Sequence, residues 1–276
     1  MKIEIIDVKF AKIFIQEKHY SPVMPKITKL CLGWFRDKDE TFLGDELCGV
    51  ITLGWGTRPS HTIKKIFPSA TTESYLEIGK FCMSEGMPPN SESEFISQSI
   101  KWIKTMRGTR AGRKHLIAPE CEYIFSWSDG AMGKPGYVYQ ASNFLYGGHI
   151  WTDFYVSADG EKIHPRSIGN HVKKSRPNDD ERRELKLDHI RGKQFRYIYP
   201  LSKSARRKLK QSTFDWNTEH PKDVDLEWKY KAWDKTKFVL TKTMPFQHNP
   251  NAIEYNEKSV NRGSQMGAAT LADFME

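Results

Sequence analysis

Apolar runs separated by polar turns divide the first half of the chain into short elements. Alternation predicts a strand over residues 3–8, and apolar positions at helical spacing predict a helix over residues 10–18. Two apolar runs around a polar turn predict a hairpin of residues 29–35 and 47–55. Polar residues 56–72 predict a loop.

The same pattern continues with a strand, a helix and another strand. The strands are predicted over residues 75–83 and 123–127, and the helix over residues 91–106. Residues 91–94, Ser-Glu-Ser-Glu, have the spacing of a capping box at the start of this helix.

A Gly/Pro-rich turn over residues 130–136 precedes a predicted helix over residues 137–144. One or two strands are predicted over residues 144–156, after which the periodicity weakens. The next predicted element is a basic helix over residues 201–210, with Ser202 as its N-cap. This order predicts an α/β (α+β) fold in which helices flank a mixed central sheet.

Positive charge gathers in the second half of the chain. The net charge is +9, and residues 162–210 hold 16 Lys or Arg against 5 Asp or Glu, with aromatic residues interleaved. This composition favours contact with a nucleic-acid backbone, and the alternative is a solvated basic face. We therefore divide the chain into a catalytic domain (1–158), a basic extension that contacts double-stranded DNA (159–250) and a loosely packed tail (251–276).

The predicted DNA contacts are basic residues of the extension and of a basic, Gly-rich segment before it. They are Arg110, Arg113, Lys114, Lys173, Lys174, Arg176, Arg191, Lys193, Arg196, Arg206, Arg207 and Lys208.

Cysteine spacing and hydropathy exclude other classes of protein. Cys31, Cys48, Cys82 and Cys121 form no Cys-x-x-Cys pair, so we expect buried, reduced thiols rather than a zinc site. No apolar stretch is long enough to span a bilayer, and the N-terminus lacks a secretory signal. These features predict a cytosolic protein without membrane contact, and they leave the oligomeric state open, a homodimer included.

Three polar positions stand where elements begin or end. Asp129 follows a strand, Tyr139 lies at a helix start, and His19 ends the first helix. The side chains at such ends often form a site in α/β folds, so we expect the three to meet in one cleft between two diverging strands. The alternatives are a capping role for Asp129, a core role for Tyr139 and pairing of His19 with the helix dipole.

Longer motifs around these positions carry a resemblance to a known family. They are His19-Tyr20-Ser21, Glu77-Ile-Gly-Lys80, Ser128-Asp129 and Gly136-x-x-Tyr139-Gln-Ala-x-Asn143-Phe. The element order resembles the GNAT acyltransferase fold, and the motifs resemble the bacteriophage Mom family over roughly residues 1–150. The resemblance implies an enzyme of the host cytoplasm that modifies DNA adenine against restriction, with a carbamoylmethyl-type group on the N6 amine.

The resemblance also implies roles for single residues. His19, Tyr20, Asp129 and Tyr139 would be catalytic. Substrate would contact Lys80, Ser128 and Asn143. Lys80 stands where the family tends to have Arg, so a bidentate grip on an anion is lost.

The family has been associated with iron and with an acetyl-CoA-like donor. His19 and Asp129 are the candidate iron ligands, with Tyr20 or Tyr139 as a third. Residues 83–91 would have to hold the CoA pyrophosphate, yet they contain one Gly and two prolines without N–H groups. We therefore expect weak CoA binding, and residues 107–114 are the alternative anion site.

Two other functions compete with DNA modification. One is a GNAT N-acetyltransferase that acts on a protein or small molecule, which predicts tight CoA binding. The other is a non-catalytic DNA-binding protein on the same scaffold, which predicts salt-sensitive DNA binding without a product.

Overall fold

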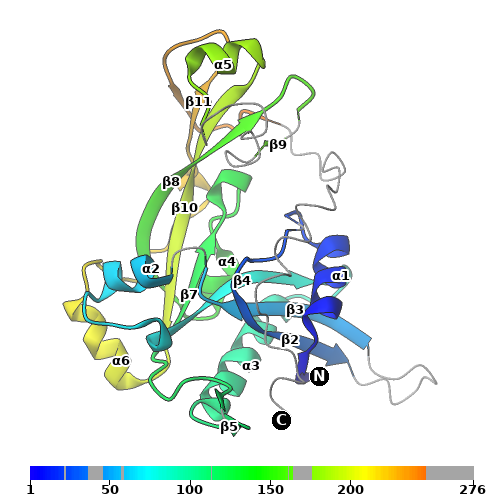
Figure 1. The fold of residues 1–276 in the computed structure, drawn as a ribbon, viewed down its shortest axis with the longest axis vertical. Helices are drawn as coiled ribbons and strands as arrows, with labels where there is room; N and C mark the ends of the chain where they lie inside the picture. Colours follow the sequence, from blue (N-terminus) through cyan, green and yellow to red (C-terminus); the bar gives the residue numbers. More distant parts are fainter. Residues whose placement is uncertain are drawn as a thin grey trace.

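One large mixed sheet organises the chain (Figure 1). The computed structural model describes residues 1–21, 23–36, 46–56, 59–112, 114–160, 162–163 and 176–246. Along the sheet the strands are β1 (Lys2–Ile6), β2 (Thr28–Arg36), β3 (Glu46–Gly54), β4 (Tyr75–Met83), β7 (Tyr123–Ser128), β10 (Asp188–Pro200), β11 (Trp228–Lys231) and β12 (Val239–Thr241). Strand β8 (Leu145–Val156) pairs with β10 and with β9 (Lys162–Ile163). A separate two-stranded ribbon is formed by β5 (Arg110–Ala111) and β6 (Lys114–His115).

Helices cover both faces of the sheet. The α-helices are α1 (Val8–Lys18), α2 (Pro59–Ile66), α3 (Ser91–Met106), α4 (Tyr137–Ala141), α5 (Asp179–Glu184) and α6 (Lys203–Lys208), and the 3-10 helices are η1 (Thr72–Ser74), η2 (Gly130–Met132), η4 (Leu209–Gln211) and η5 (Asp223–Asp225). Helix α3 buries its apolar stripe on one face, against strand residues such as Leu76 and Ile124. Helices α1, α2 and α6 pack on the opposite face, through two further apolar clusters. The expected mixed α/β architecture is therefore confirmed.

Two central strands run parallel and then separate. Among the strand pairs of the described structure, β4 and β7 alone are parallel, and their pairing ends at Ile78 and Ser126. Just beyond, Gly79 is the extra residue of a β-bulge in β4, where a side chain would collide with Pro25. The carboxyl ends of β4 and β7 therefore open a gap in the middle of the sheet.

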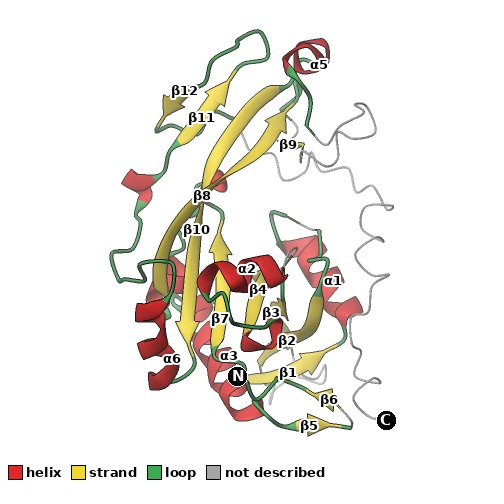
Figure 2. Cartoon of the chain, turned by 60° about the vertical axis from the view of Figure 1, so that its left-hand side comes forward, coloured by secondary structure: helices red, strands yellow, loops and turns green. Residues whose placement is uncertain are grey.

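A long antiparallel strand pair, β8 and β10, carries the sheet upward into an arm. Strands β8 and β10 have 12 and 13 residues, about twice the usual strand length. Their lower halves belong to the body, and their upper halves support β9, β11, β12 and α5 (Figures 1 and 2). Because β10 pairs with both β7 and β8, the predicted domain boundary at residue 158 runs through a continuous sheet.

Several local expectations need correction. Helix α2 lies in the segment expected as a loop, and β10 lies where the periodicity is weak. The capping box at residues 91–94 is wrong: the N-cap is Asn90, which adopts a left-handed conformation and makes no side-chain cap bond. The helix after the Gly/Pro turn stops at Ala141, because Asn143 turns the chain with a positive φ.

Two other local expectations, the cap of α6 and the state of the cysteines, are confirmed. Ser202 caps α6 by accepting a hydrogen bond from the Ala205 N–H. All four cysteines are buried and unpaired. Within the described ranges, we find no helix with the length and apolar character needed to cross a membrane. The predicted tail over residues 251–276 lies outside the described residues.

Candidate active site where β4 and β7 diverge

Tyr20 lies at the centre of a cluster of polar side chains. Its ring stacks on His19 with a centroid distance of 4.4 Å, and its hydroxyl donates to Asp129 Oδ2 at 3.5 Å. Lys134 Nζ lies 5.0 Å from the ring centroid of Tyr20. Burial and the Asp129 carboxylate raise the pKa of Tyr20, so this phenol stays protonated at neutral pH.

The loop after β7 fixes Asp129. Its backbone carbonyl accepts from the Met132 and Lys134 amides, and the Ser128 hydroxyl donates to the Lys134 carbonyl at 2.6 Å. The Asp129 side chain makes no cap bond to η2. The alternative that Asp129 serves as a cap is therefore wrong, and its carboxylate is left facing Tyr20.

His19 is a neutral imidazole in this structure. Its Nδ1 accepts a hydrogen bond from the Ser21 N–H at 2.9 Å, so that nitrogen carries no proton. Burial, followed by the Lys80 ammonium, lowers the pKa of His19 to about 3. A neutral ring cannot pair with the negative end of the α1 dipole, so that alternative is excluded at neutral pH.

Tyr139 approaches the same cluster from the other face of the sheet. It is buried beside Phe144 and Tyr197, and its hydroxyl faces the side chain of Ser126 at the end of the β4–β7 pairing. Burial raises its pKa to about 12, and its phenol in turn contributes to the raised pKa of Tyr20. His19, Tyr20 and Asp129 therefore lie together as predicted. Tyr139 is packed in the hydrophobic core, in agreement with the alternative of a core role, and influences Tyr20 only electrostatically. The catalytic roles of all four residues stay predictions.

Three lysines surround the cluster. Lys80 Nζ donates to the carbonyl and hydroxyl of Ser21 at 2.7 and 2.9 Å. Lys162, on β9 of the arm, reaches down to within 4.0 Å of Asp129 Oδ2. Lys134 covers Tyr20 from the loop. Burial lowers the pKa of Lys80 to about 8, which leaves most of it charged at pH 7.

Glu77 is a polar feature of this region to which sequence reasoning assigned no role. It lies in the middle of β4, opposite Gly54 and Phe125 on the neighbouring strands. Its carboxyl lies against Gly56, and burial raises its pKa to about 7. A carboxyl on a central strand is unusual. The presence of Glu77 within an apolar strand pattern could therefore have identified it from the sequence as a candidate functional residue.

The other predicted substrate contacts differ in placement. Ser128 is buried and its hydroxyl is used to hold the loop. Asn143 is exposed at the end of α4, where its left-handed backbone terminates the helix. Of this group, Lys80 alone lies in the cluster around Tyr20.

The described residues do not fit an iron site. No group of three His, Cys, Asp or Glu side chains suited to a metal occurs among them. The Nδ1 atom of His19 is already engaged, Lys162 Nζ lies 4.0 Å from Asp129 Oδ2, and the Lys80 ammonium is within electrostatic range of both candidate ligands. This concentration of positive charge repels a metal cation, so the reaction proposed below does not use iron.

Within the described residues, the predicted DNA contacts fall into three groups. Arg110, Lys114, Arg206, Arg207 and Lys208 are exposed. Arg176 and Arg191 pair with Asp153, and Lys193 pairs with Glu227. The Arg196 guanidinium is enclosed between Phe214 and Trp127, so it offers no charge to a ligand at the surface. Arg113, Lys173 and Lys174 lie outside the described residues.

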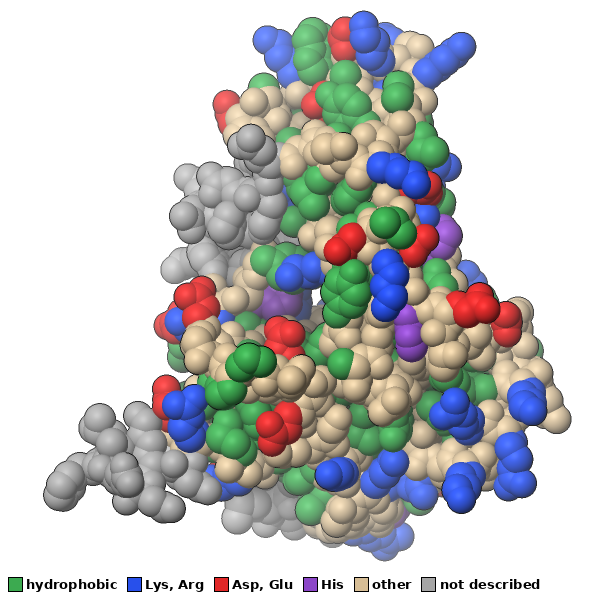
Figure 3. Space-filling model, turned by 180° about the vertical axis from the view of Figure 1, so that it is seen from behind, with side chains coloured by type: hydrophobic (Ala, Val, Ile, Leu, Met, Phe, Trp, Pro, Cys, Tyr) green, Lys and Arg blue, Asp and Glu red, His purple; other side chains and the backbone are tan. Residues whose placement is uncertain are grey.

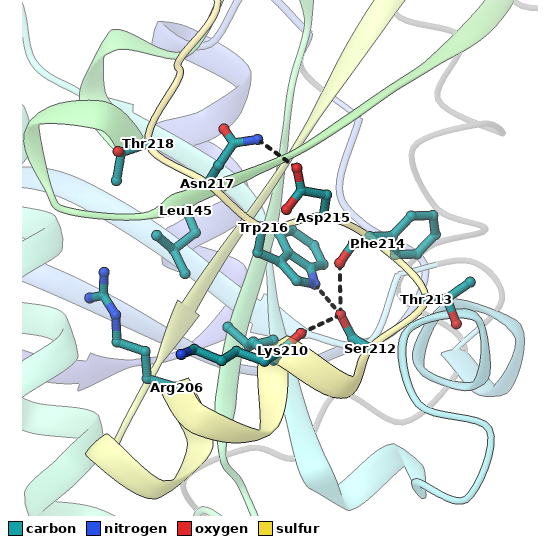
Figure 4. Close-up of a pocket in the computed structure, with 11 residues that line it drawn as sticks. Leu145, Arg206, Lys210, Ser212, Thr213, Phe214, Asp215, Trp216, Asn217 and Thr218 are labelled. Carbon is teal, nitrogen blue, oxygen red and sulfur yellow. Dashed lines mark hydrogen bonds between the residues drawn. The ribbon is translucent and has the colours of Figure 1, made fainter.

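A recess lies beside α6. Its volume is about 590 Å³, and Arg206 and Lys210 line one side while Phe214 and Trp216 line another (Figure 4). None of the four predicted catalytic residues lines it. Lys and Arg side chains gather over α6 on the lower right of the face in Figure 3. This recess therefore combines basic and aromatic groups at the surface.

Comparison with known proteins defines the class. The sequence model of the Mom protein family matches residues 1–220, so the chain belongs to the Mom protein family. Its sequence is similar to that of the methylcarbamoylase Mom of Escherichia phage Mu, with 31% identity over 216 residues. The aligned region covers 78% of this chain and 81% of the relative. The match extends beyond the motifs of the first 150 residues and includes β10 and α6.

Proposed function

We propose that the protein is a DNA-modifying transferase that adds a small carbamoylmethyl- or acyl-type group to the N6 amine of adenine and thereby protects phage DNA from restriction. The observation that carries the proposal is the contact of Tyr20 with both Asp129 and His19 where β4 and β7 separate. Membership of the Mom family and similarity to a methylcarbamoylase support the same reaction class.

The chemistry requires that the amine lose a proton. The N6 nitrogen of adenine is a weak nucleophile, and the new N–C bond leaves it with one hydrogen fewer. In the same transfer, the bond between the transferred carbon and the rest of the donor breaks, and the leaving group departs with that electron pair. The Asp129 carboxylate, 26% exposed, is the group placed to accept that proton. Tyr20 stays protonated and orients Asp129 through its hydroxyl, and the neutral His19 ring supports Tyr20 by stacking.

The substrate proposed is adenine in double-stranded DNA, presented out of the helix. An enzyme that reacts at the N6 atom of a stacked base has to extrude the nucleotide first. The arm rises on one side of the site through Lys162, and α6 offers exposed Arg206, Arg207 and Lys208 on the surface. Basic groups at both places favour contact with phosphates on either side of the extruded base.

A GNAT-like body is part of the proposal. The parallel pair β4–β7, its separation after Ile78 and the bulge at Gly79 support that fold. The usual donor of that fold is less well supported, because the turn before α3 uses its amides internally: Ser84 donates to Cys48 and Ser91 to Pro88. Glu92 and Glu94 in the first turn of α3 also oppose a pyrophosphate.

The test of the proposed function is a comparison of Asp129→Asn with the unchanged protein in cells. Nucleosides from the DNA of expressing cells are analysed by mass spectrometry for adenine that carries the added group. We expect Asp129→Asn to lower the modified fraction by about 100-fold or more, as loss of a catalytic base does. Thermal unfolding should change little, because Asp129 contributes no apolar burial.

The matched control is Asp159→Asn, which removes the same charge from an exposed turn. It should keep full modification. Undiminished modification by Asp129→Asn would contradict the catalytic role, and salt-sensitive DNA binding without any modified base would favour the non-catalytic alternative.

A further inference from the structure

We propose that Lys80, Lys134 and Lys162 form a binding site for a small anionic group, a carboxylate or a phosphate, directly beside Tyr20 and Asp129. The inference rests on the proposed function and extends it, because the target adenine is itself uncharged. The anion belongs either to a free co-substrate or to the DNA phosphate next to the extruded nucleotide.

The charge balance of the site carries the inference. Within the described structure, Asp129 is the carboxylate in contact with this cluster, and three ammonium groups surround it and Tyr20. His19 is neutral, so it adds no positive charge and supplies no negative charge to balance the lysines. Lys80 and Lys162 are partly buried, and an excess of positive charge in a partly buried site is costly without an anionic partner.

Each lysine keeps hydrogen-bond capacity for a ligand. An ammonium group has three N–H donors, and Lys80 uses two of them on Ser21. Lys162 contacts Asp129 at 4.0 Å and the sulfur of Met132 at 3.0 Å. Both interactions are weak, so its N–H donors can still bind a ligand. Lys134 lies over an aromatic ring and is exposed, so its donors are open to an arriving group.

The three lysines come from three separate parts of the fold. Lys80 lies on β4, Lys134 lies in the loop after η2, and Lys162 lies on β9 of the arm. Charges of like sign repel one another, and the Lys162 ammonium contributes to the lowered pKa of Lys80. Local sequence does not force this approach, so the arrangement points to a shared ligand rather than to a solvated basic face.

Inorganic phosphate and acetate are the probes for the test. Each is titrated by calorimetry into the purified full chain at constant ionic strength, and the unfolding temperature is recorded in parallel. We expect one saturable site and a rise in unfolding temperature, because a ligand of the native state stabilises it. Lys134→Gln and Lys162→Gln should each weaken binding about tenfold, which corresponds to about 1.4 kcal/mol.

Lys101→Gln is the matched control, since it removes one exposed charge from α3 on the other face of the sheet. It should leave both titrations unchanged. Lys134 is exposed, so its variant folds even if a change at a buried lysine does not. Absence of saturable binding, or equal binding by the unchanged protein and both variants, would overturn the proposal.

A saturating short DNA duplex separates the two sources of the anion. Acetate binding that persists with DNA present assigns the site to a free co-substrate. Acetate binding that DNA abolishes, with weaker DNA binding by Lys162→Gln, assigns it to a backbone phosphate. Both results support the anion site, and neither measurement requires that the protein modify adenine. Intact anion binding without any modified adenine would contradict only the proposed function.

Discussion

At the scale of single residues, Tyr20 links the parts of the site. Its hydroxyl contacts Asp129, which is 109 residues away in the chain, and its ring contacts both His19 and Lys134. A phenol in this position can only orient its neighbours while it keeps its proton, and burial secures that state by raising its pKa. The proposed reaction therefore depends on a tyrosine that does not ionise.

Glu77 gives a test of the burial that surrounds the site. Its pKa is raised from 4.5 to about 7 by burial, so between these values the unfolded chain releases the proton while the folded chain keeps it. Stability should therefore fall as pH rises through this window and stay lowered above it. Glu77→Gln removes the penalty, and we expect it to stabilise the protein by about 2 kcal/mol at pH 8 but not at pH 4.

Denaturant unfolding of Glu77→Gln at several pH values measures this effect. Glu85→Gln is the control, because Glu85 is exposed on a turn. A gain that is the same at pH 4 and pH 8 would show that packing rather than ionisation determines the change.

At the scale of elements, α6 tests the contact with DNA. Arg206, Arg207 and Lys208 are exposed, and of the three Lys208 pairs with Glu122 at 2.6 Å. The triple change to Ala should weaken binding to all duplexes alike and flatten the dependence of log K on log salt by about 2. The control is the change of Lys9, Lys12 and Lys101, on other helices, to Ala. It removes the same number of positive charges and should leave the slope nearly unchanged.

Fluorescence anisotropy with labelled duplexes at several salt concentrations gives both quantities. If affinity and slope match those of the unchanged protein, the cations of α6 are a solvated face. The paired Arg176, Arg191 and Lys193 would then be the next candidates, at the cost of their internal ion pairs.

The turn between β4 and α3 tests the donor. Two of its amides are engaged, Pro88 and Pro89 have none, and the first turn of α3 carries Glu92 and Glu94. We expect acetyl-CoA to bind with a dissociation constant well above the low-micromolar range. Calorimetry with acetyl-CoA measures this directly, and low-micromolar affinity would restore an ordinary acetyltransferase mechanism.

Local sequence was sufficient for some elements and not for others. Strand β4 and helix α3 have strong periodicity and begin and end where it predicts. Strand β10 escaped detection because its apolar residues are spread among charged ones, and contacts on both sides with β7 and β8 decide its conformation. The cap of α3 was misjudged because Ser91 is buried inside the first turn.

At the scale of the whole molecule, the arm and the site loop share a contact. Gly192 of β10 faces η2 so closely that a Cβ atom would lie 2.3 Å from the Cβ of Ala131. The Ala131 carbonyl also accepts from Trp228 Nε1 at 2.9 Å. The loop that follows Asp129 is thus held against β10 and β11.

Gly192→Ala should push η2 away from β10. We expect a loss of stability of about 1–3 kcal/mol and a larger loss of modification, because Asp129 and Lys134 move with the loop. Gly86→Ala is the control: nothing lies within 4 Å of its Cβ, and its positive φ costs about 1 kcal/mol without touching the site. Equal modification by the two variants at equal stability would contradict this coupling.

The sequence by itself determined the side chains that stand at the ends of elements. His19, Asp129 and Tyr139 could be identified because a strand end, a helix end and a helix start are local events that periodicity and turn residues define. The same local information sets the polarity of α6 and the burial of the four cysteines.

Only the tertiary structure decided which of the charged residues act together. Lys162 reaches Asp129 because β9 pairs with β8 of the arm, and Arg196 is lost from the surface because Phe214 and Trp127 enclose it. Burial and pairing depend on contacts between distant segments, and those contacts set the pKa of a group and its access to solvent. Composition therefore located the positive charge of this chain, and only the fold divided it among ion pairs, the surface of α6 and the site around Tyr20.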